Sequence, residues 1–175
     1  MADPILETRA RLHEGTKIEC AITILRPVSE VFAFWNDFSN LPKFMKNLDS
    51  VEKISAIESK WRWNTVADRF IEWHSHTIAV LENKMISWQS VGASDIDHAG
   101  SIWFRPAPQD DATEVHIQVM LKTPGGKLVE TVARTLGEYP KTILMADLHR
   151  LKALLEAGEI PTTEGQPHGK RGILH

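Results

Sequence analysis

The hydrophobic pattern changes its period at Pro27, and this change predicts where a strand ends and a helix begins. Over residues 17–25 apolar and polar residues alternate, which is typical of a half-buried strand. Pro27 suits the first positions of a helix, where its missing N–H costs nothing, and aromatic and apolar residues crowd 31–38. Residues 40–42 interrupt this helix, and a second apolar turn begins at 43–45. The pattern therefore predicts two short helices after the first strand.

The middle of the chain is rich in β-branched and aromatic residues, in segments separated by turn-forming residues. These segments lie near 49–57, 59–66, 69–82, 84–91, 99–107 and 112–122. With the first strand they predict seven antiparallel strands. From 127 to 157 the apolar spacing becomes helical, and Gly158 marks the end of this helix. Pro140 is expected to kink or restart it, because proline removes a backbone hydrogen bond.

The same order of elements carries a resemblance to a known family. The segments concerned are DFSNLPKFM at 37–45, IEW at 71–73, ISW at 86–88, HAGSIWFRPAP at 98–108 and LKALLEAGEIPTTEGQPHGKR at 151–171. The chain resembles the START-like (SRPBCC) superfamily over roughly residues 17–171, and within it the polyketide cyclase/dehydrase and lipid-transport branch. The resemblance implies an α+β helix-grip fold, with the seven-stranded sheet curved around the C-terminal helix. Because this fold carries lipid transfer, hormone binding, cyclisation and protein interaction, the resemblance predicts the function less specifically than it predicts the fold.

Composition agrees with one domain. A chain of 175 residues with 42% hydrophobic residues can bury a sizeable core. We expect an extension over 1–16, the START-like domain over 17–158 and a tail containing proline and glycine over 159–175. The net charge of −3 gives no basic field for nucleic acid. No apolar run has the length of a membrane span, so the cytoplasm is the expected location.

Strand alternation predicts which side chains face the C-terminal helix. The resemblance implies that a hydrophobic ligand occupies the gap between this face and the helix. The expected ligand-binding residues are Phe34, Phe38, Phe44, Met45, Trp61, Trp63, Trp73, Trp88, Ile102, Phe104, Tyr139 and Leu148. This wall is almost wholly apolar and poor in inward charge. The alternative is that the same aromatic residues simply fill the core.

The opposite face of the sheet carries several histidines. His74 and His76 lie two residues apart, and His116 falls on a neighbouring part of the same face. A zinc site with these three ligands is one interpretation, and exposed strand histidines are the favoured one. The same face also shows the apolar residues Ile78, Val80 and Met120. A homodimer contact there is a reasonable alternative.

Sequence signatures of catalysis are missing, and no cofactor or metal is expected. The single cysteine, Cys20, excludes an internal disulfide and is expected to be buried on the first strand. Tyr139 could move a proton, or could only pack its ring at the helix break. A loop with Asp95, Asp97 and His98 could reach a cavity mouth, although a solvated turn is the favoured interpretation.

Three functions therefore compete. The first is binding of a hydrophobic small molecule, such as a lipid, an isoprenoid quinone or a polyketide-like compound. The second is a cyclase or dehydratase acting in the same cavity, which would need at least one ionisable group pointing inward. The third is a protein-interaction module with a filled core. The size of the cavity separates the third function from the other two.

Overall fold

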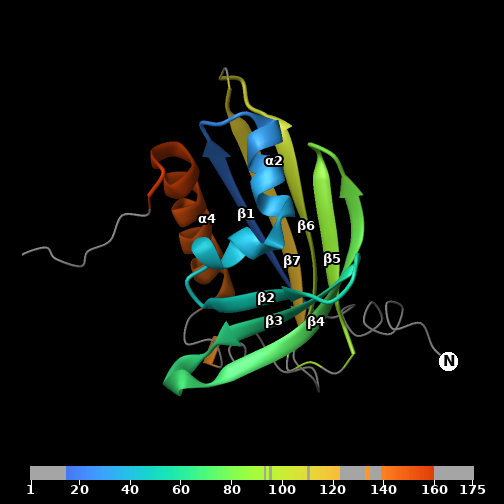
Figure 1. Cartoon of the computed structure of the whole chain (residues 1–175). Helices are drawn as coiled ribbons and strands as arrows, with labels where there is room; N and C mark the ends of the chain where they lie inside the picture. The colour runs from blue at the N-terminus through green and yellow to red at the C-terminus, as the bar shows by residue number, and fades with distance from the viewer. Residues whose placement is uncertain are drawn as a thin grey trace, which may run out of the picture.

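Seven antiparallel strands form one curved sheet, and a C-terminal helix packs against its first strand (Figure 1). The computed structural model describes residues 15–159 except 93, 95, 110, 123–132 and 135–138. The strands are β1 (Thr16–Ile24), β2 (Leu48–Lys53), β3 (Glu58–Asn64), β4 (Phe70–Leu81), β5 (Met85–Val91), β6 (Asp97–Pro106) and β7 (Thr113–Lys122). Their order in the sheet is β1-β7-β6-β5-β4-β3-β2. The predicted α+β helix-grip architecture is confirmed.

Two short helices follow β1, as the change of period predicts. Helix α2 (Val28–Asn36) begins directly after Pro27, and the 3₁₀ helix η1 (Phe38–Lys43) contains Pro42. Asp37 separates the two helices, because its carboxylate accepts hydrogen bonds from the Ser39 backbone N–H at 3.1 Å and hydroxyl at 2.6 Å. A second 3₁₀ turn, η2 (Val66–Asp68), lies between β3 and β4 and was not predicted.

The C-terminal helix α4 (Pro140–Ala157) begins at Pro140 and ends before Gly158. Pro140 thus starts a helix instead of kinking one, since its missing N–H costs nothing at the first helical position. Gly158 adopts φ 76°, a left-handed conformation that suits glycine at a helix end. The predicted helical segment before Tyr139 falls largely on residues outside those described. So do almost all of the predicted extension and tail, and the domain boundaries stay predictions.

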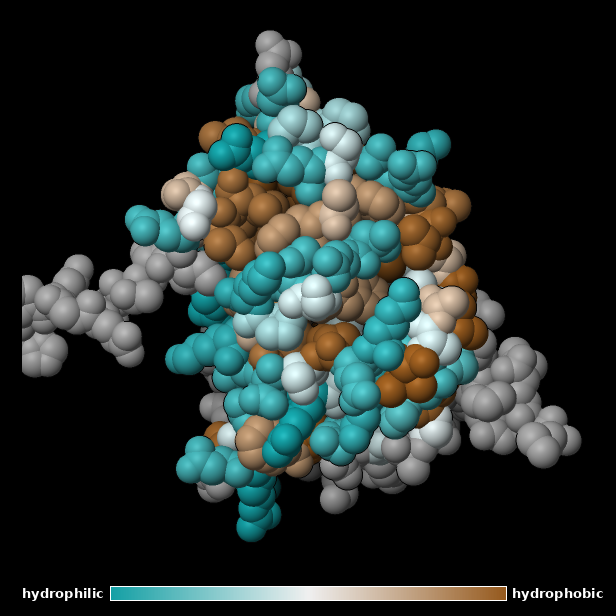
Figure 2. Space-filling view, in the orientation of Figure 1, coloured by the Kyte–Doolittle hydropathy of each residue, from teal (hydrophilic) through white to brown (hydrophobic). Residues whose placement is uncertain are grey.

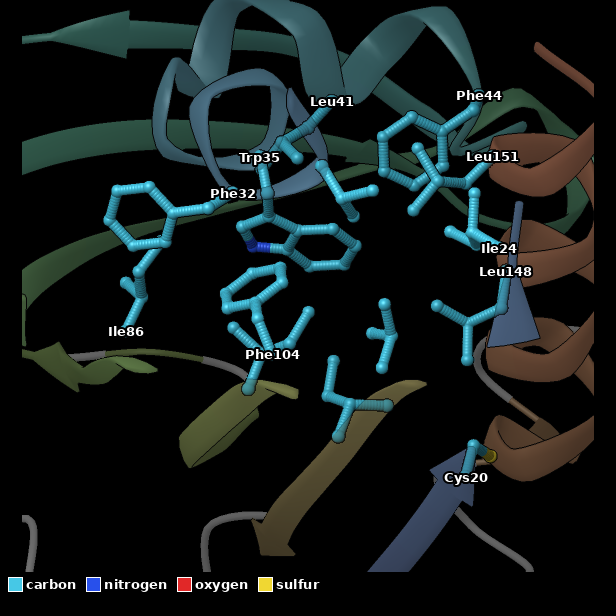
Figure 3. Packing of buried hydrophobic residues seen from close by; sticks show 14 of the residues in the cluster. Cys20, Ile24, Phe32, Trp35, Leu41, Phe44, Ile86, Phe104, Leu148 and Leu151 are labelled. Carbon is cyan, nitrogen blue, oxygen red and sulfur yellow. The ribbon is translucent and has the colours of Figure 1, made fainter. Parts of the chain in front are cut away.

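The core is built around Trp35 of α2, which is 3% exposed (Figure 3). Its ring lies 5.5 Å from that of Phe44, and Phe32 of the same helix meets Phe104 of β6 edge to face at 5.5 Å. Fully buried aliphatic side chains from β1 and α4, including Ile24 and Leu148, close the cluster. Cys20 is buried and free, as expected.

The opposite face of the sheet carries the histidines. His74 Nδ1 lies 2.7 Å from Glu58 Oε1, and His76 Nε2 lies 3.7 Å from the other oxygen of the same carboxylate. His116 stacks on Trp103 at 5.4 Å. Within the described residues no group of three His, Cys, Asp or Glu side chains could hold a metal ion.

Apolar side chains are exposed near the end of β4. Ile78, Val80 and Leu81 are each about half exposed, and Figure 2 shows hydrophobic residues on the right-hand side of the view, where β4 and β5 lie. A β-bulge between Thr77 and Ala79 pairs Val80 with the fully buried Ile86, so Val80 lies on the core face of the sheet and its predicted place on the histidine face is wrong. A homodimer through the histidine face stays a prediction. No helix in the described part of the chain is long and apolar enough to cross a membrane.

Candidate functional site

A cavity of about 160 Å³ lies between the sheet and α4 and is partly open to solvent. It sits where β1 and β6 begin and where β5 and β7 end, next to the first two turns of α4. Its lining residues are Ile18, Trp35, Phe38, Leu41, Met45, Trp61, Trp63, Ile71, Trp73, Trp88, Ile96, His98, Ile117, Val119, Leu121, Pro140, Ile143, Leu144 and Asp147. An engineered cavity of about 150 Å³ is large enough for benzene, so this cavity can hold a small ring or chain.

Six of the twelve predicted ligand-binding residues line this cavity. They are Phe38, Met45, Trp61, Trp63, Trp73 and Trp88. Phe34, Phe44, Ile102, Phe104 and Leu148 instead pack in the hydrophobic core. Strand alternation assigns a residue to a face of the sheet but does not say how far along the strand the filled core ends. Phe104 lies at the filled end of β6, whereas His98 lies at the end that borders the cavity.

Tyr139 lies outside the cavity. It is 58% exposed and immediately precedes α4, where it borders a separate surface pocket beside the start of β1. The next residue, Pro140, does line the cavity. The position of Tyr139 therefore agrees better with a residue that packs at the helix break than with a ligand contact.

His98 is a buried residue of β6, so the predicted solvated turn is wrong for Asp97 and His98, which are 4% and 9% exposed. The His98 backbone N–H donates to Ser90 Oγ at 3.0 Å, and its ring meets Trp73 edge to face at 5.2 Å. Burial lowers the pKa of the His98 imidazole to about 4. His98 is therefore neutral at pH 7 and presents an uncharged ring to the cavity. Asp95 lies outside the described residues.

Asp147 of α4 places a carboxylate in the cavity wall, which corrects the expectation of a wall poor in inward charge. It is 1% exposed. Its Oδ1 accepts hydrogen bonds from the Arg150 guanidinium and, at 3.2 Å, from the Lys46 backbone N–H. Its Oδ2 has no partner among the described residues. Burial raises the pKa of Asp147, while Arg150 and the Lys46 backbone N–H favour its charged form.

Arg150 joins α4 to the loop after η1. Its Nε donates to the Phe44 carbonyl at 2.9 Å, while its other end holds Asp147. Asp147 and Arg150 lie about one helical turn apart, and in a sequence this spacing is typical of an ion pair on a helix surface.

The sheet side of the cavity contributes three indole rings in contact. Trp61 stacks on Trp73 at 6.0 Å, and Trp63 lies 6.3 Å from Trp73. The Trp61 N–H donates to Ser59 Oγ at 2.7 Å. The Nε1 atoms of Trp63 and Trp73 are buried and lack partners in the described part of the chain. A buried donor without a partner is costly, and the N–H groups of Trp63 and Trp73 each lack an acceptor among the described residues.

A glycine creates the space for Trp88, the fourth tryptophan that lines the cavity from the sheet. Gly100 of β6 pairs with Trp88 of β5, and a Cβ atom at Gly100 would lie only 2.4 Å from Trp88 Cζ2. The indole therefore lies directly over the backbone of Gly100. This close approach sets the position of the Trp88 ring at the cavity wall.

Comparisons with known proteins identify what the chain is similar to. A family model described as polyketide cyclase / dehydrase and lipid transport matches residues 24–147. A crystal structure of a protein from Deinococcus radiodurans is 30% identical, with a TM-score of 0.66 over 82% of this chain and 98% of that one. A START superfamily protein from Mycobacterium smegmatis is 10% identical, with a TM-score of 0.64 over 82% of this chain and 97% of that one.

A biosynthetic protein shares the fold as well. The di-domain ARO/CYC protein BexL, from the BE-7585A biosynthetic pathway, is 16% identical, with a TM-score of 0.61. The match covers 80% of this chain and 47% of BexL. At this identity the likeness concerns the fold alone.

Proposed function

Because the chain belongs to the polyketide cyclase/dehydrase and lipid transport family, we propose that it binds an apolar small molecule in the cavity between the sheet and α4. The observation that carries the proposal is the cavity itself, which aromatic and aliphatic side chains line almost throughout. An apolar guest gains about 25 cal/mol for each Å² of apolar surface removed from water. Lipids, isoprenoid quinones and polyketide-like compounds all offer such surface, and those larger than the cavity would extend through its open side.

Filling the cavity tests this function. Val119 lines the cavity from β7 and is only partly buried, so Val119→Phe is expected to occupy the space that a ligand needs. Affinity for a small apolar probe such as toluene should fall at least about tenfold, since loss of buried probe surface weakens binding directly. Calorimetric titration measures the affinity, and thermal unfolding followed by circular dichroism checks that the variant is folded.

The matched control makes the same substitution elsewhere. Val80 is 46% exposed on β4 and lies outside the cavity, so Val80→Phe should leave toluene binding unchanged. Equal loss of affinity in both variants would contradict binding in the cavity. Absence of toluene binding by the unaltered protein would favour the protein-interaction module instead.

A second candidate function is dehydration or cyclisation of a ligand in the same cavity. The specific observation in its favour is that two ionisable groups, His98 and Asp147, line the cavity. In the dehydration of a β-hydroxy ketone, a base takes the proton from the carbon next to the carbonyl and a C=C bond forms. The hydroxyl leaves with a proton as water, which restores the base. Neutral His98 has a ring nitrogen that can accept that proton, although a pKa of about 4 makes it a weak base at pH 7.

A chromogenic substrate separates the two functions. Loss of water from a phenyl-substituted β-hydroxy ketone gives a conjugated enone that absorbs in the ultraviolet. Turnover by the purified protein that disappears in His98→Asn, with toluene binding retained, would establish the enzyme. Binding without turnover would favour a carrier.

A further inference from the structure

One residue of the cavity wall, Asp147, has a side-chain oxygen that lacks a hydrogen-bond donor in the described part of the chain. Asp147 is 1% exposed, and its Oδ2 has no partner among the described residues. Burying a carboxylate oxygen without a hydrogen bond is costly, so a fold retains one only where a partner arrives from elsewhere or a function requires it. Because Asp147 lines the cavity, a bound ligand is the group in position to supply that donor.

The surroundings of Asp147 fix which of its oxygens is free. Arg150 and the Lys46 backbone N–H both donate to Oδ1. Burial raises the pKa of Asp147, but these two donors hold the carboxyl group in one orientation and stabilise its ionised form, which can only accept hydrogen bonds. A ligand group at Oδ2 must therefore carry a hydrogen, as a hydroxyl does. A ligand carboxylate has no hydrogen to donate and would meet a negative oxygen.

The opposite wall has the complementary polarity. The unpartnered Nε1 atoms of Trp63 and Trp73 can only donate, and both residues belong to the sheet side of the cavity, whereas Asp147 belongs to α4. An oxygen on the ligand that faces the sheet would accept from these indoles. The remaining wall is apolar apart from neutral His98.

We propose that the ligand is an uncharged, largely apolar molecule with a hydroxyl group that donates a hydrogen bond to Asp147 Oδ2. This inference rests on the proposed function, because it names the class of ligand that the same cavity takes. It distinguishes phenol-like and alcohol-like ligands from fatty acids, which share the apolar body but end in a carboxylate. Asp147 is then the residue that determines specificity.

Phenol and toluene test the inference, because both fit a cavity of this size and differ by a hydroxyl in place of a methyl group. Titrations at pH 8 favour the ionised form of Asp147 over the protonated form that burial stabilises. The unaltered protein should bind phenol at least as tightly as toluene, and benzoate at least about tenfold more weakly than phenol. In a wall without a partner for the hydroxyl, phenol would instead bind more than about tenfold more weakly than toluene.

Asp147→Asn replaces the charged acceptor with an amide of the same size. Phenol affinity should fall about tenfold while toluene affinity stays the same, since a hydrogen bond to a charged group is stronger than one between neutral groups. The matched control is Asp49→Asn, the same change at an exposed position on β2, which should alter neither affinity.

The possible results separate the inference from the function on which it rests. Toluene binding with phenol bound more than tenfold more weakly would overturn the inference and leave the proposed function standing. Failure of both probes to bind would overturn the proposed function. If Asp147→Asn does not fold, the affinities of the unaltered protein for phenol, toluene and benzoate still test the inference.

Discussion

Replacing Arg150 by methionine is expected to lower the free energy of unfolding by about 3 kcal/mol at pH 7. Methionine keeps much of the length and apolar volume of arginine but removes the guanidinium that donates to Asp147 Oδ1 and to the Phe44 carbonyl. The Asp147 carboxylate would then be buried with the Lys46 backbone N–H as its one remaining donor among the described contacts. Removing one partner of a buried ion pair is costly because the other charge stays in an apolar environment.

The pH dependence of this effect has a defined sign. Burial raises the pKa of Asp147 above its ordinary value, and loss of Arg150 would raise it further. The cost of the substitution should therefore shrink as the pH falls and the folded state takes up a proton at Asp147. Urea unfolding at pH 7 and pH 4.5 measures the difference from the unaltered protein.

A double substitution separates charge burial from lost packing. Replacing both partners, as Asp147→Leu with Arg150→Met, should restore much of the stability, since no charge is then left buried. A double variant no more stable than Arg150→Met would contradict this explanation and point to the Phe44 contact instead.

The second large effect is expected from His98. The free energy of unfolding should fall by about 3 kcal/mol as the pH falls from 6.5 to 4. Burial lowers the pKa of its imidazole to about 4 in the folded protein, whereas an unfolded histidine titrates near 6.5. Between these values the unfolded chain binds a proton that the folded protein does not, so acid favours unfolding. Each pH unit across this range contributes about 1.4 kcal/mol.

His98→Asn isolates this contribution from those of other titrating groups. Asparagine keeps a side-chain N–H near the position of Nδ1, which lies 3.3 Å from the Ile96 carbonyl, but it does not titrate. The variant should lose most of the difference in stability between pH 7 and pH 4.5. His149→Asn, the same change at an exposed position of α4, should keep it. Parallel pH profiles for His98→Asn and the unaltered protein would refute the assignment.

The sequence predicted the faces of the sheet well because a strand has a period of two. Trp61, Trp63, Trp73 and Trp88 lie on the cavity side, as their spacing required. The position of the cavity along the strands was not predictable in this way. It depends on where Trp35 and Phe104 fill the space between the layers, and this is a property of packing in three dimensions.

Asp147 and Arg150 were not predicted as site residues, and His98 was named only as part of a loop that could reach the cavity mouth. Asp147 and Arg150 lie three residues apart on an amphipathic helix, where charged residues usually face water. His98 follows two aspartates and a glycine, a composition typical of turns. The alternation of β6 did hold a signal, because His98 shares the parity of Ile102 and Phe104, and extending that strand by two residues would have placed it inward.

Gly100 has a consequence for how cavity size can vary among proteins with this fold. Because the Trp88 indole lies on bare backbone, any side chain at position 100 must displace the ring from its seat. The sheet beneath is held by strand pairing on both sides of β6, so the ring has to move away from the strand and toward the space where a guest would lie. Gly100, which does not itself line the cavity, therefore determines how much of the cavity the Trp88 ring leaves free. Exchange of glycine for alanine at this single site is therefore expected to reduce the cavity volume without any change in the residues of the aromatic wall.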